Sequence, residues 1–507
     1  MADDAVAQTL AGLIAAQAAA RPGAVFACDT ESAASLSFGE LESGCRSLAA
    51  WLAARGVGPG DTVSLVMPNG LMTLRLLLGA MVAGVCVNPV NLLSQPAQMR
   101  HVLEHSDCKL VFAAPDWFDR VQAMCAALPR QVSVQQIHPD ALRLPDERDA
   151  ELPTGAQEPD PDSLALLMYT SGTTGVPKGV MLTQANLTAN ARAIAAEHAL
   201  GQQDRVLGVL PLYHINAFAV TMLAPLASGG SLAMAPRFSA TRFWDQALGS
   251  RCTWINVVPT MMAFLLEADA ADAKDLSALR FCRSASAALA PEHLRAFERR
   301  FGIGVIETMG LTETAAPAFS NPLQAEQRKL GSVGRASGGQ ACVIDPQGRP
   351  MPDGQTGELA IRGPHVMRGY YKDEGATAAT FTADGWLRTG DMGHRDADGF
   401  YFVTGRLKEL IIKGGENIAP REIDEVLLAH PAVRDGAAVG IPDARYGQEI
   451  MACIVLREGH AADEPALRAF CTERLGRYKT PSQFRFVAEL PRGPSGKVQR
   501  LKLAGLA

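Results

Sequence analysis

An apolar run that leads into a loop of glycines and hydroxyl residues is the feature that most constrains this fold. Residues 164–169 read LALLMY, which is typical of a buried strand. The next ten residues read TSGTTGVPKG and contain no acid. Glycine permits tight backbone curvature, and such a turn can point N–H groups inward at an anion. Because Lys178 adds a positive charge, the stretch predicts a cradle for a polyphosphate at the end of a buried strand.

The loop differs from the P-loop of nucleotide triphosphatases. That motif has Gly-Lys followed by Ser or Thr. Here Pro177 precedes Lys178 and Gly179 follows it. Taken alone, the stretch is equally a solvated Ser/Thr/Gly turn between a strand and a helix. The remainder of the chain has to decide between the two interpretations.

The composition excludes several classes of protein. A chain of 507 residues is too long for one compact core, which predicts two or more structural units. Hydrophobic residues make up 48% and charged residues 20%, as in ordinary soluble globular proteins. The net charge of −6, without a basic block, argues against nucleic acid as the main partner. Ten scattered cysteines without a Cys-x-x-Cys pair suit a reducing cytosol and predict neither a disulfide framework nor a zinc site.

Two segments decide whether the chain is expected to meet a membrane. The N-terminus begins Met-Ala-Asp-Asp, which is acidic where a secretory signal is basic, so a cytoplasmic location is expected. Residues 206–236 carry no formal charge, but Pro211, His214, Asn216, Pro225 and a Gly-Gly pair interrupt them. We therefore expect a buried segment that lines a pocket and no membrane span.

Helical and strand patterns alternate in the first 150 residues. Apolar residues recur at helical spacing over 38–55, and 62–67 reads TVSLVM, a strand. Residues 76–87 are a continuous apolar segment, interpreted as a buried helix and the strand after it. This alternation predicts an α/β fold with parallel sheet and helices on its faces. Residues 136–161, rich in Pro, Asp and Glu, are interpreted as an exposed connection to the loop.

The loop and several later motifs together resemble the acyl-adenylate-forming enzymes, which include acyl-CoA synthetases, peptide-synthetase adenylation domains and beetle luciferases. The motifs occur in the family's order, and the resemblance covers nearly the whole chain. They are PLYHIN at 211–216, ETMGLTET at 307–314, WLRTGD at 386–391, GRLKELIIKGGENIAPREID at 405–424 and PRGPSGKVQR at 491–500. The resemblance implies a large multi-sheet N-terminal domain, 1–407, and a small mobile α/β C-terminal domain, 408–507, with Lys408 at the hinge.

For the nucleotide, the resemblance implies a site assembled from several motifs. Glu313 offers a carboxylate suited to Mg²⁺, which prefers one or two carboxylates together with phosphate oxygens. Asp391 matches the residue that holds the ribose hydroxyls, and Arg406 is placed to contact the ribose or the α-phosphate. Lys497 matches the catalytic lysine that bridges the acid and the α-phosphate. The other expected ATP contacts are Thr170, Ser171, Gly172, Thr173, Thr174, Gly175, Lys178, Ala285, Ala287, Met309 and Gly310, with Thr312 as a catalytic hydroxyl donor.

This chain departs from the family pattern at a few of these positions. Ala285 and Ala287 stand where the family has glycines against which adenine lies, and their small side chains still permit close approach. Met309 stands where the family has an aromatic ring, which leaves the shape of the acid pocket open. Thr312 and Glu313 also fit a plain helix cap, and that alternative stays open.

The acid pocket is expected to combine apolar and polar side chains. His214, a catalytic candidate by its motif, lies in an apolar run where a lone histidine is otherwise a core residue. His214 and Arg283 offer positive charge to a second anionic group, as in ligases for malonate-like or sulfonated acids. Arg283 on the opposite face of its strand, meeting solvent, is the preferred alternative. The expected lining residues are His214, Phe218, Val258, Arg283, Ser284, Ser286 and Ala316.

The thiol substrate is expected to approach through the C-terminal part of the chain. A Gly-Gly pair there leaves room for a pantetheine arm, and it is also compatible with a plain turn between two strands. Two tyrosines are expected to stack on the CoA adenine, and a lysine is expected to meet one of its phosphates. The residues concerned are Lys413, Gly414, Gly415, Tyr446, Tyr478 and Lys479.

Together these expectations describe an AMP-forming acid–CoA ligase that uses ATP, Mg²⁺ and coenzyme A. It activates a carboxylic acid to acyl-AMP and then transfers the acyl group to CoA. The expected acid is small and polar or anionic, malonate- or sulfoacetate-like. The alternatives are a medium- or long-chain fatty acyl-CoA synthetase and a stand-alone ligase that loads a separate carrier protein. The chain stops ten residues after Lys497, which favours free CoA over a fused carrier domain, and a homodimer is left open.

Overall fold

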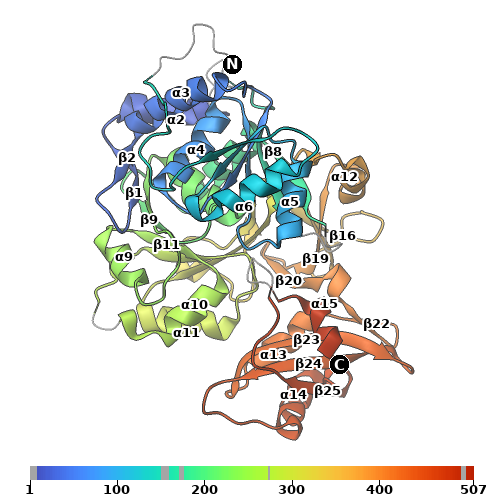
Figure 1. The fold of residues 1–507 in the computed structure, drawn as a ribbon. Coiled ribbons are helices and arrows are strands. Elements are labelled where there is room, and N and C mark those ends of the chain that lie inside the picture. The colour runs from blue at the N-terminus through green and yellow to red at the C-terminus, as the bar shows by residue number, and fades with distance from the viewer. Residues whose placement is uncertain (1–7, 150–158, 171–175, 272–273, 493–497, 507) are drawn as a thin grey trace.

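The computed structural model describes residues 8–149, 159–170, 176–271, 274–492 and 498–506. In Figure 1 a large body of sheets and helices contains most of the chain, and a smaller α/β unit lies at one end of it. The described residues form sheets of nine, seven, five and four strands. Within this part of the chain, no helix combines the length and apolar character that crossing a membrane requires.

The seven-stranded sheet contains the two strands that flank the predicted phosphate loop. Its central strands are parallel, whereas β7 and β8 pair antiparallel and β18 adds antiparallel to β8. In spatial order the strands are β18 (Gly369–Tyr370), β8 (Lys178–Thr183), β7 (Leu164–Thr170), β4 (Cys86–Pro89), β3 (Thr62–Val66), β5 (Leu110–Ala113) and β6 (Ser133–Gln136).

The nine-stranded sheet is parallel through its middle and antiparallel at both edges. In spatial order its strands are β15 (Arg335–Ala336), β14 (Ala316–Ser320), β13 (Val305–Leu311), β12 (Phe281–Ser284), β11 (Trp254–Val257), β9 (Arg205–Gly208), β10 (Ser231–Met234), β1 (Val25–Asp29) and β2 (Ser35–Ser37). Its parallel strands end on the same edge, where ligands commonly bind in α/β sheets.

Helices cover both faces of the two large sheets, and the largest hydrophobic core lies between the sheets (Figure 1). That core includes residues of α2 (Leu10–Ala20), α3 (Phe38–Ala53), α4 (Leu71–Val82), α7 (Gln184–Glu197), the π-helix η1 (Asn216–Leu223) and α8 (Ala224–Ser228). The outer face of the nine-stranded sheet packs on α9 (Phe243–Gly249), α10 (Pro259–Glu267) and α11 (Pro291–Phe301). The outer face of the seven-stranded sheet packs on α5 (Pro96–His105) and α6 (Pro115–Ala126).

A four-stranded antiparallel sheet follows, with its own small core. Its strands are β16 (Gln340–Ile344), β17 (Gly357–Arg362), β19 (Leu387–Arg395) and β20 (Tyr401–Arg406), and α12 (Glu374–Thr380) lies in the connection before β19. The short 3₁₀ segments are η2 (Asp269–Ala271), η3 (Thr312–Thr314), η4 (Ala325–Gln327), η5 (Leu407–Glu409) and η6 (Ala504–Leu506).

The smaller unit is built around the five-stranded sheet. Its strands are β22 (Glu416–Ile418), β21 (Ile411–Lys413), β24 (Gly447–Leu456), β23 (Val433–Asp443) and β25 (Gln483–Phe486). Its helices are α13 (Pro420–Leu428), α14 (Glu464–Lys479) and α15 (Arg500–Leu503). Two hydrophobic clusters pack on the two sides of this sheet, and both draw only on residues 411–504. The predicted α/β class, with a large N-terminal and a small C-terminal part, is confirmed.

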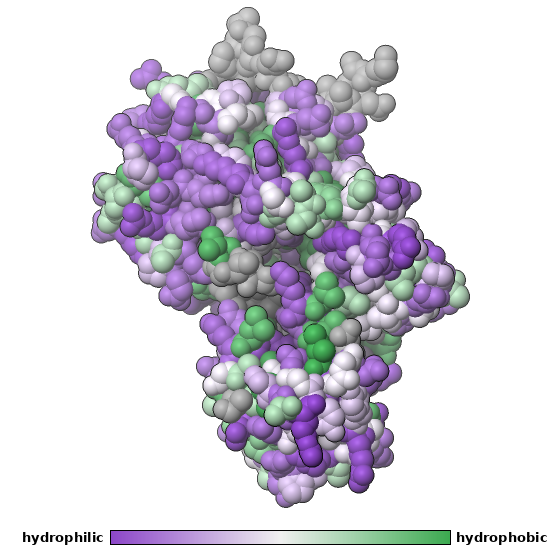
Figure 2. All heavy atoms as spheres, turned by 90° about the vertical axis from the view of Figure 1, so that its right-hand side faces the viewer, coloured by the Kyte–Doolittle hydropathy of each residue, from purple (hydrophilic) through white to green (hydrophobic). Residues whose placement is uncertain are grey.

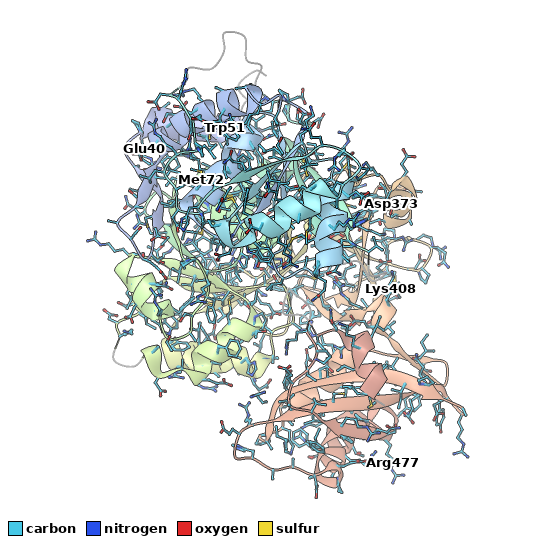
Figure 3. All side chains as sticks on the ribbon, viewed as in Figure 1. Glu40, Trp51, Met72, Asp373, Lys408 and Arg477 are labelled. Carbon is cyan, nitrogen blue, oxygen red and sulfur yellow. The ribbon has the colours of Figure 1, made fainter. Side chains whose placement is uncertain are left out.

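The boundary between the two parts stays a prediction at Lys408. Figure 3 labels this residue at the junction between the large body and the smaller unit. Figure 2 shows apolar side chains on the surface at the same junction. Leu407 and Ile412, which lie on either side of Lys408 in the sequence, are 49% and 53% exposed.

Several local predictions can be compared with the fold. The helix over 38–55, the strand over 62–67 and the helix and strand over 76–87 are confirmed by α3, β3, α4 and β4. The segment after the phosphate loop is a strand, β8, so the alternative of a turn between a strand and a helix is wrong. The exposed connection predicted from residue 136 is wrong in its first part. Leu144 is 4% exposed, and Glu147 forms an ion pair with Arg75 in a buried position.

Candidate active site

The ends of the predicted phosphate loop meet across a hairpin. Strand β7 ends at Thr170 and β8 begins at Lys178, and these two residues are paired opposite each other. A Cβ added at Gly179 would lie 2.9 Å from Cδ1 of Leu167, so a larger residue there would have to displace that side chain. Ser171, Gly172, Thr173, Thr174 and Gly175 lie outside the described residues. Their contacts with phosphate stay a prediction.

Lys178 and Glu313 approach each other through a tyrosine that the sequence analysis did not assign. The Tyr370 hydroxyl donates a hydrogen bond of 2.8 Å to Oε1 of Glu313. The Lys178 ammonium lies 4.9 Å from the centroid of the Tyr370 ring. Burial, and then the Glu313 carboxylate, raises the pKa of Tyr370. Thr312 and Glu313 begin the 3₁₀ turn η3, and the Glu313 side chain binds Tyr370 instead of capping a helix.

Met309, Gly310 and Ala316 lie together where β13 turns into β14. Gly310 pairs opposite Pro317, and Leu311 pairs opposite Ala316. A Cβ at Gly310 would lie 2.0 Å from the carbonyl oxygen of Ala316, so no other residue fits there without moving the backbone. Ala316 has a φ of +95°, a conformation that non-glycine residues rarely adopt. The strained backbone and the required glycine indicate a site whose shape is held by close packing.

The expectation that Arg283 meets solvent is wrong. Its side chain does not meet solvent: it is 1% exposed and lies on the face of β12 that is turned toward the space between the two large sheets. Its Nη1 donates to Oδ1 of Asn216 at 2.8 Å and to Oδ1 of Asn256 at 3.2 Å. Burial lowers its pKa to about 9, and the nearby Glu197 carboxylate opposes this shift. In the described part of the chain, no carboxylate forms an ion pair with Arg283, and its Nε has no hydrogen-bond partner.

The residues that follow Arg283 form a polar turn next to the same cluster. Ser284 is 1% exposed, and its hydroxyl lacks a hydrogen-bond partner among the described residues. Ser286 has a φ of +75°, and its hydroxyl accepts a long hydrogen bond of 3.4 Å from Asn216. Ala285 is buried and Ala287 is exposed, so only Ala285 is enclosed by neighbouring side chains. Their adenine contacts stay predictions.

The other predicted acid-pocket residues lie near this cluster along the chain. Asn216 begins η1 two residues after His214, and Phe218 lies within the same π-helix. The backbone N–H of Phe218 donates to the carbonyl of His214 at 3.0 Å. Phe218 is fully buried in the large core, and Val258 is the N-cap of α10 at the edge of that core. Their contacts with an acid stay predictions.

Asp391 and Arg406 face each other on neighbouring strands. They are paired positions in the β19–β20 hairpin, and Nε of Arg406 lies 2.9 Å from Oδ1 of Asp391. Asp391 is 4% exposed, and its carboxylate is the main cause of the raised pKa of Arg406. A buried carboxylate held by a guanidinium keeps its charge and a fixed orientation. This geometry suits the predicted ribose site, and the contact of Asp391 with ribose stays a prediction.

The six predicted CoA residues gather in the smaller unit. Gly414 and Gly415 have positive φ values and join β21 to β22, so they form the turn that the sequence predicted. The N–H of Gly414 donates to the carbonyl of Tyr446 at 2.8 Å, and the Tyr478 hydroxyl binds the carbonyl of Lys413. Tyr446 and Tyr478 are 45% and 41% exposed. The exposed rings therefore flank a narrow glycine turn.

The two lysines of this cluster are already paired in the structure. Lys413 is 6% exposed, and its Nζ lies 2.5 Å from Oε1 of Glu449 and 2.9 Å from the carbonyl of Tyr478. Lys479 binds both carboxylate oxygens of Glu422, at 2.8 Å and 2.7 Å. Contact of Lys479 with a CoA phosphate therefore requires it to leave Glu422.

Lys497, the predicted catalytic lysine, lies outside the described residues. The described residues around it are held by the smaller unit: Arg492 and Val498 form an antiparallel bridge. Arg500 binds the Asp424 carboxylate at 2.7 Å and Glu409 at 3.2 Å. Glu409 directly follows Lys408, so Arg500 connects the C-terminal segment to the predicted hinge.

Three residues of the site were missed by the sequence analysis. Asn216 was noted only as an interruption of a charge-free stretch and as the end of the PLYHIN motif, and Tyr370 was given no role. Asn256 stands between Ile255 and Val257 in a buried strand. A polar side chain in an apolar strand needs a partner when it is buried, and that was the available signal.

The surroundings of Glu313 fit a magnesium ion that arrives with a nucleotide. Glu313 has one carboxylate oxygen bound by Tyr370 and forms no ion pair within the described residues. Over the same residues, no three His, Cys, Asp or Glu side chains cluster to hold a metal by themselves. Mg²⁺ commonly takes one or two carboxylates and completes its shell with phosphate oxygens and water. A lone carboxylate beside Lys178 matches that pattern.

Comparisons with known proteins cover both parts of the chain. The family model of the AMP-binding enzymes matches residues 14–371, and that of the AMP-binding enzyme C-terminal domain matches residues 422–497. A sulfoacetate–CoA ligase of Cupriavidus necator is 57% identical over 498 residues, which is 98% of this chain and 97% of that protein. An oxalate–CoA ligase of Arabidopsis thaliana is 36% identical and covers 88% of both chains.

A solved structure agrees with these relatives. The ATP-bound MatB from Rhodopseudomonas palustris superposes with a TM-score of 0.91 at 30% identity, over 98% of each chain. The likeness therefore includes the large body and the smaller unit together. By family models, curated relatives and fold alike, this chain belongs to the family of AMP-binding enzymes, and within it to the AMP-forming ligases that use ATP to join an acid to coenzyme A.

Proposed function

We propose that this ligase activates a small acid with a second anionic group, and that sulfoacetate is its substrate. The relative with 57% identity is named a sulfoacetate–CoA ligase, which supports this choice. A sulfonate keeps its negative charge throughout the physiological pH range, so its binding site needs a lasting positive charge. The acid–CoA ligase class alone does not specify such a group, and a residue of this chain has to supply it.

The observation that carries the proposal is the buried guanidinium of Arg283. A buried cation is costly unless an anion compensates it. Its hydrogen-bond acceptors are the neutral amides of Asn216 and Asn256. An incoming sulfonate offers three oxygens and a full negative charge to the planar donors of the guanidinium. Ser286, 3.4 Å from Asn216, adds a hydroxyl beside the same cluster.

In the first half-reaction, a carboxylate oxygen of the acid attacks the α-phosphorus of ATP and pyrophosphate leaves. The site has to align these groups and offset the charge that builds on the phosphates. Lys178 and the loop hydroxyls are assigned to the β- and γ-phosphates, and Thr312 donates to a phosphate or acyl-phosphate oxygen. Asp391 accepts from the ribose hydroxyls, and Lys497 bridges the acid and the α-phosphate. Glu313 would hold a magnesium ion, which would supply further positive charge to the phosphates.

In the second half-reaction, the CoA thiol attacks the acyl carbon and AMP leaves. A thiol with a pKa of about 8.5 supplies usable thiolate near neutral pH, so no dedicated base is required. The Gly414–Gly415 turn admits the pantetheine arm, and the rings of Tyr446 and Tyr478 receive the adenine. The smaller unit turns about Lys408 between the two steps, which withdraws Lys497.

The substrate is tested by ATP–pyrophosphate exchange with a panel of acids. We expect exchange with sulfoacetate to exceed exchange with malonate and oxalate, and to exceed acetate and decanoate by a wide margin. Thioester formation from the best acid is then measured with free CoA and with a carrier protein as acceptors. A preference for decanoate over the dianionic acids would refute the anionic pocket, and transfer to the carrier alone would refute the assignment of CoA.

The variant Lys497→Ala tests whether Lys497 acts in one or in both half-reactions. This variant should lose acyl-AMP formation while it still forms thioester from preformed acyl-AMP. Equal loss of both half-reactions would contradict the role assigned to Lys497.

A further inference from the structure

Tyr370 is fixed at its backbone by two neighbouring elements. It lies on the edge strand β18, where it pairs opposite Val180 of β8. Its N–H donates to Oγ1 of Thr377 in α12 at 2.9 Å, and Thr377 in turn donates to the carbonyl of Asp373 at 2.8 Å. Figure 3 labels Asp373 at this edge of the large body. The strand and the helix together leave the Tyr370 backbone little freedom to move.

The ring of Tyr370 contacts two groups of opposite charge. Its hydroxyl donates to Oε1 of Glu313 at 2.8 Å, and the Lys178 ammonium lies over its face at 4.9 Å from the centroid. The same chain segment also holds the backbone of Glu313, because the N–H of Met367 donates to its carbonyl at 2.8 Å. All three side chains are partly buried.

Lys178 and Glu313 do not pair with each other in the described structure. A lysine and a glutamate that meet in a partly buried place attract strongly, and a direct pair would satisfy both charges internally. The phenol offers each group a different partner: its negative ring face attracts the ammonium, and its O–H donates to the carboxylate. Both charges stay in place without cancelling each other.

We infer that Tyr370 is a positioning residue that keeps Lys178 and Glu313 apart and aims both at the phosphates of one Mg·ATP. The inference rests on the proposed roles of these two residues in binding ATP. Tyr370 itself touches neither the acid nor the reacting phosphorus. Its contribution is therefore expected in the affinity for Mg·ATP, which can be measured without any acid present.

The test is calorimetric titration of the full-length enzyme with Mg·ATP. Tyr370→Phe keeps the ring under Lys178 and removes the hydrogen bond to Glu313. Because a hydrogen bond to a charged group is stronger than one between neutral groups, we expect the dissociation constant to rise by about 10-fold or more. The chain offers a matched control in Tyr371→Phe, which removes a hydroxyl bound to Asp107 at 2.8 Å on the neighbouring residue. The control should bind Mg·ATP as the wild type does.

A second variant separates the effect of the Tyr370 ring from that of its hydrogen bond to Glu313. Tyr370→Leu removes the ring as well, so Lys178 and Glu313 can pair directly, and we expect a further weakening of about 5-fold from the lost cation–π contact. In a Glu313→Gln background, Tyr370→Phe should raise the dissociation constant by less than about 2-fold, because the tyrosine hydroxyl that it removes has no charged partner there.

Each outcome bears on the inference. Wild-type affinity of Tyr370→Phe, an equal loss in Tyr371→Phe, or an undiminished effect in the Glu313→Gln background would overturn it. If the wild type itself does not bind Mg·ATP, the proposed function fails instead. Thermal unfolding midpoints within about 2 °C of the wild type show that each affinity refers to a folded enzyme.

Discussion

Two arginines with mostly enclosed side chains, Arg283 in the large body and Arg500 in the smaller unit, are stabilised in opposite ways. The Arg500 guanidinium binds two carboxylates, Asp424 at 2.7 Å and Glu409 at 3.2 Å, and the carbonyl of Ala438 at 2.6 Å. Burial is the largest single influence and works against its charge, but the Asp424 and Glu409 carboxylates together outweigh burial and raise the pKa of Arg500.

Among the described residues, no carboxylate lies within ion-pair distance of Arg283, and Glu197 acts on it only from farther away. Its acceptors are two asparagine amides, and burial lowers its pKa to about 9. The comparison teaches that burial of a cation does not by itself indicate a ligand site. A guanidinium that is paired with carboxylates stabilises the fold. A buried guanidinium with only neutral hydrogen-bond partners is stabilised further when an anionic substrate binds to it. The following predictions test this distinction, from the largest expected effect to the smallest.

Removing Arg500 should damage the fold. In Arg500→Met the mostly enclosed Asp424 carboxylate loses its partner, so we expect a loss of about 3 kcal/mol in the free energy of unfolding of the smaller unit. Urea denaturation followed by a probe placed in that unit measures it. Adding Asp424→Asn to the variant should restore part of the loss. A variant as stable as the wild type would mean that the pair is not structural.

Removing Arg283 should damage catalysis instead. In Arg283→Gln we expect kcat/KM for sulfoacetate to fall by about 100- to 1000-fold, the scale of losing one partner of a buried charge pair. The rate with acetate, which has no second anionic group, should fall much less, and the unfolding free energy should stay within about 1 kcal/mol of the wild type. Equal losses with sulfoacetate and acetate would place Arg283 with Arg500 as a structural residue.

Acid should destabilise the surroundings of Arg283. His198 is 1% exposed, and burial, assisted by the Arg283 charge, lowers its pKa to about 3. The unfolded chain binds this proton below pH of about 6.5 and the folded chain does not, so stability falls as the pH drops from there toward 3. At pH 5 the loss is about 2 kcal/mol.

The variant that checks this pH dependence is His198→Phe, which keeps an aromatic ring against Phe281 but does not titrate. Its free energy of unfolding should fall by about 2 kcal/mol less than that of the wild type between pH 6.5 and pH 5. Parallel pH profiles for the two proteins would show that His198 is not buried in its neutral form.

A fourth variant gives Arg283 the partner that Arg500 already has. Asn256 is 1% exposed and lies 3.2 Å from Nη1 of Arg283, so Asn256→Asp places a carboxylate against the guanidinium. We expect KM for sulfoacetate to rise by about 10-fold, because the new carboxylate competes with the substrate anion. Asn256→Leu is the control for loss of the amide alone. An unchanged KM in Asn256→Asp would contradict the inference that the Arg283 charge binds the substrate anion.

Much of the site's location could be predicted from local patterns. The apolar run before the phosphate loop is a buried strand that ends at Thr170, and the Gly414–Gly415 turn lies between two short strands, as the residue types indicated. The orientation of Arg283 could not be predicted. Both faces of its sheet are covered by helices, so its strand lacks the polar and apolar alternation that would tell the two faces apart.

The structure of the segment after the phosphate loop was left undecided by the sequence for a related reason. Residues 178–183 read KGVMLT, a short apolar run that does not distinguish a strand from the start of a helix. Its pairing with β7 on one side and with β18 on the other decides the matter. That pairing brings together residues about 190 positions apart in the chain.

The sequence by itself determined the family, because its motifs resemble those of the family and occur in the same order, and that resemblance also supplied the residues expected to meet ATP. Only the tertiary structure decided which charges are paired. Arg283 between Asn216 and Asn256, and Tyr370 between Lys178 and Glu313, are contacts of residues 27 to 192 positions apart. Whether a buried charge stabilises the fold or binds a substrate depends on which groups surround it in the folded protein. Coulomb energy depends on distance in space and not on separation along the chain.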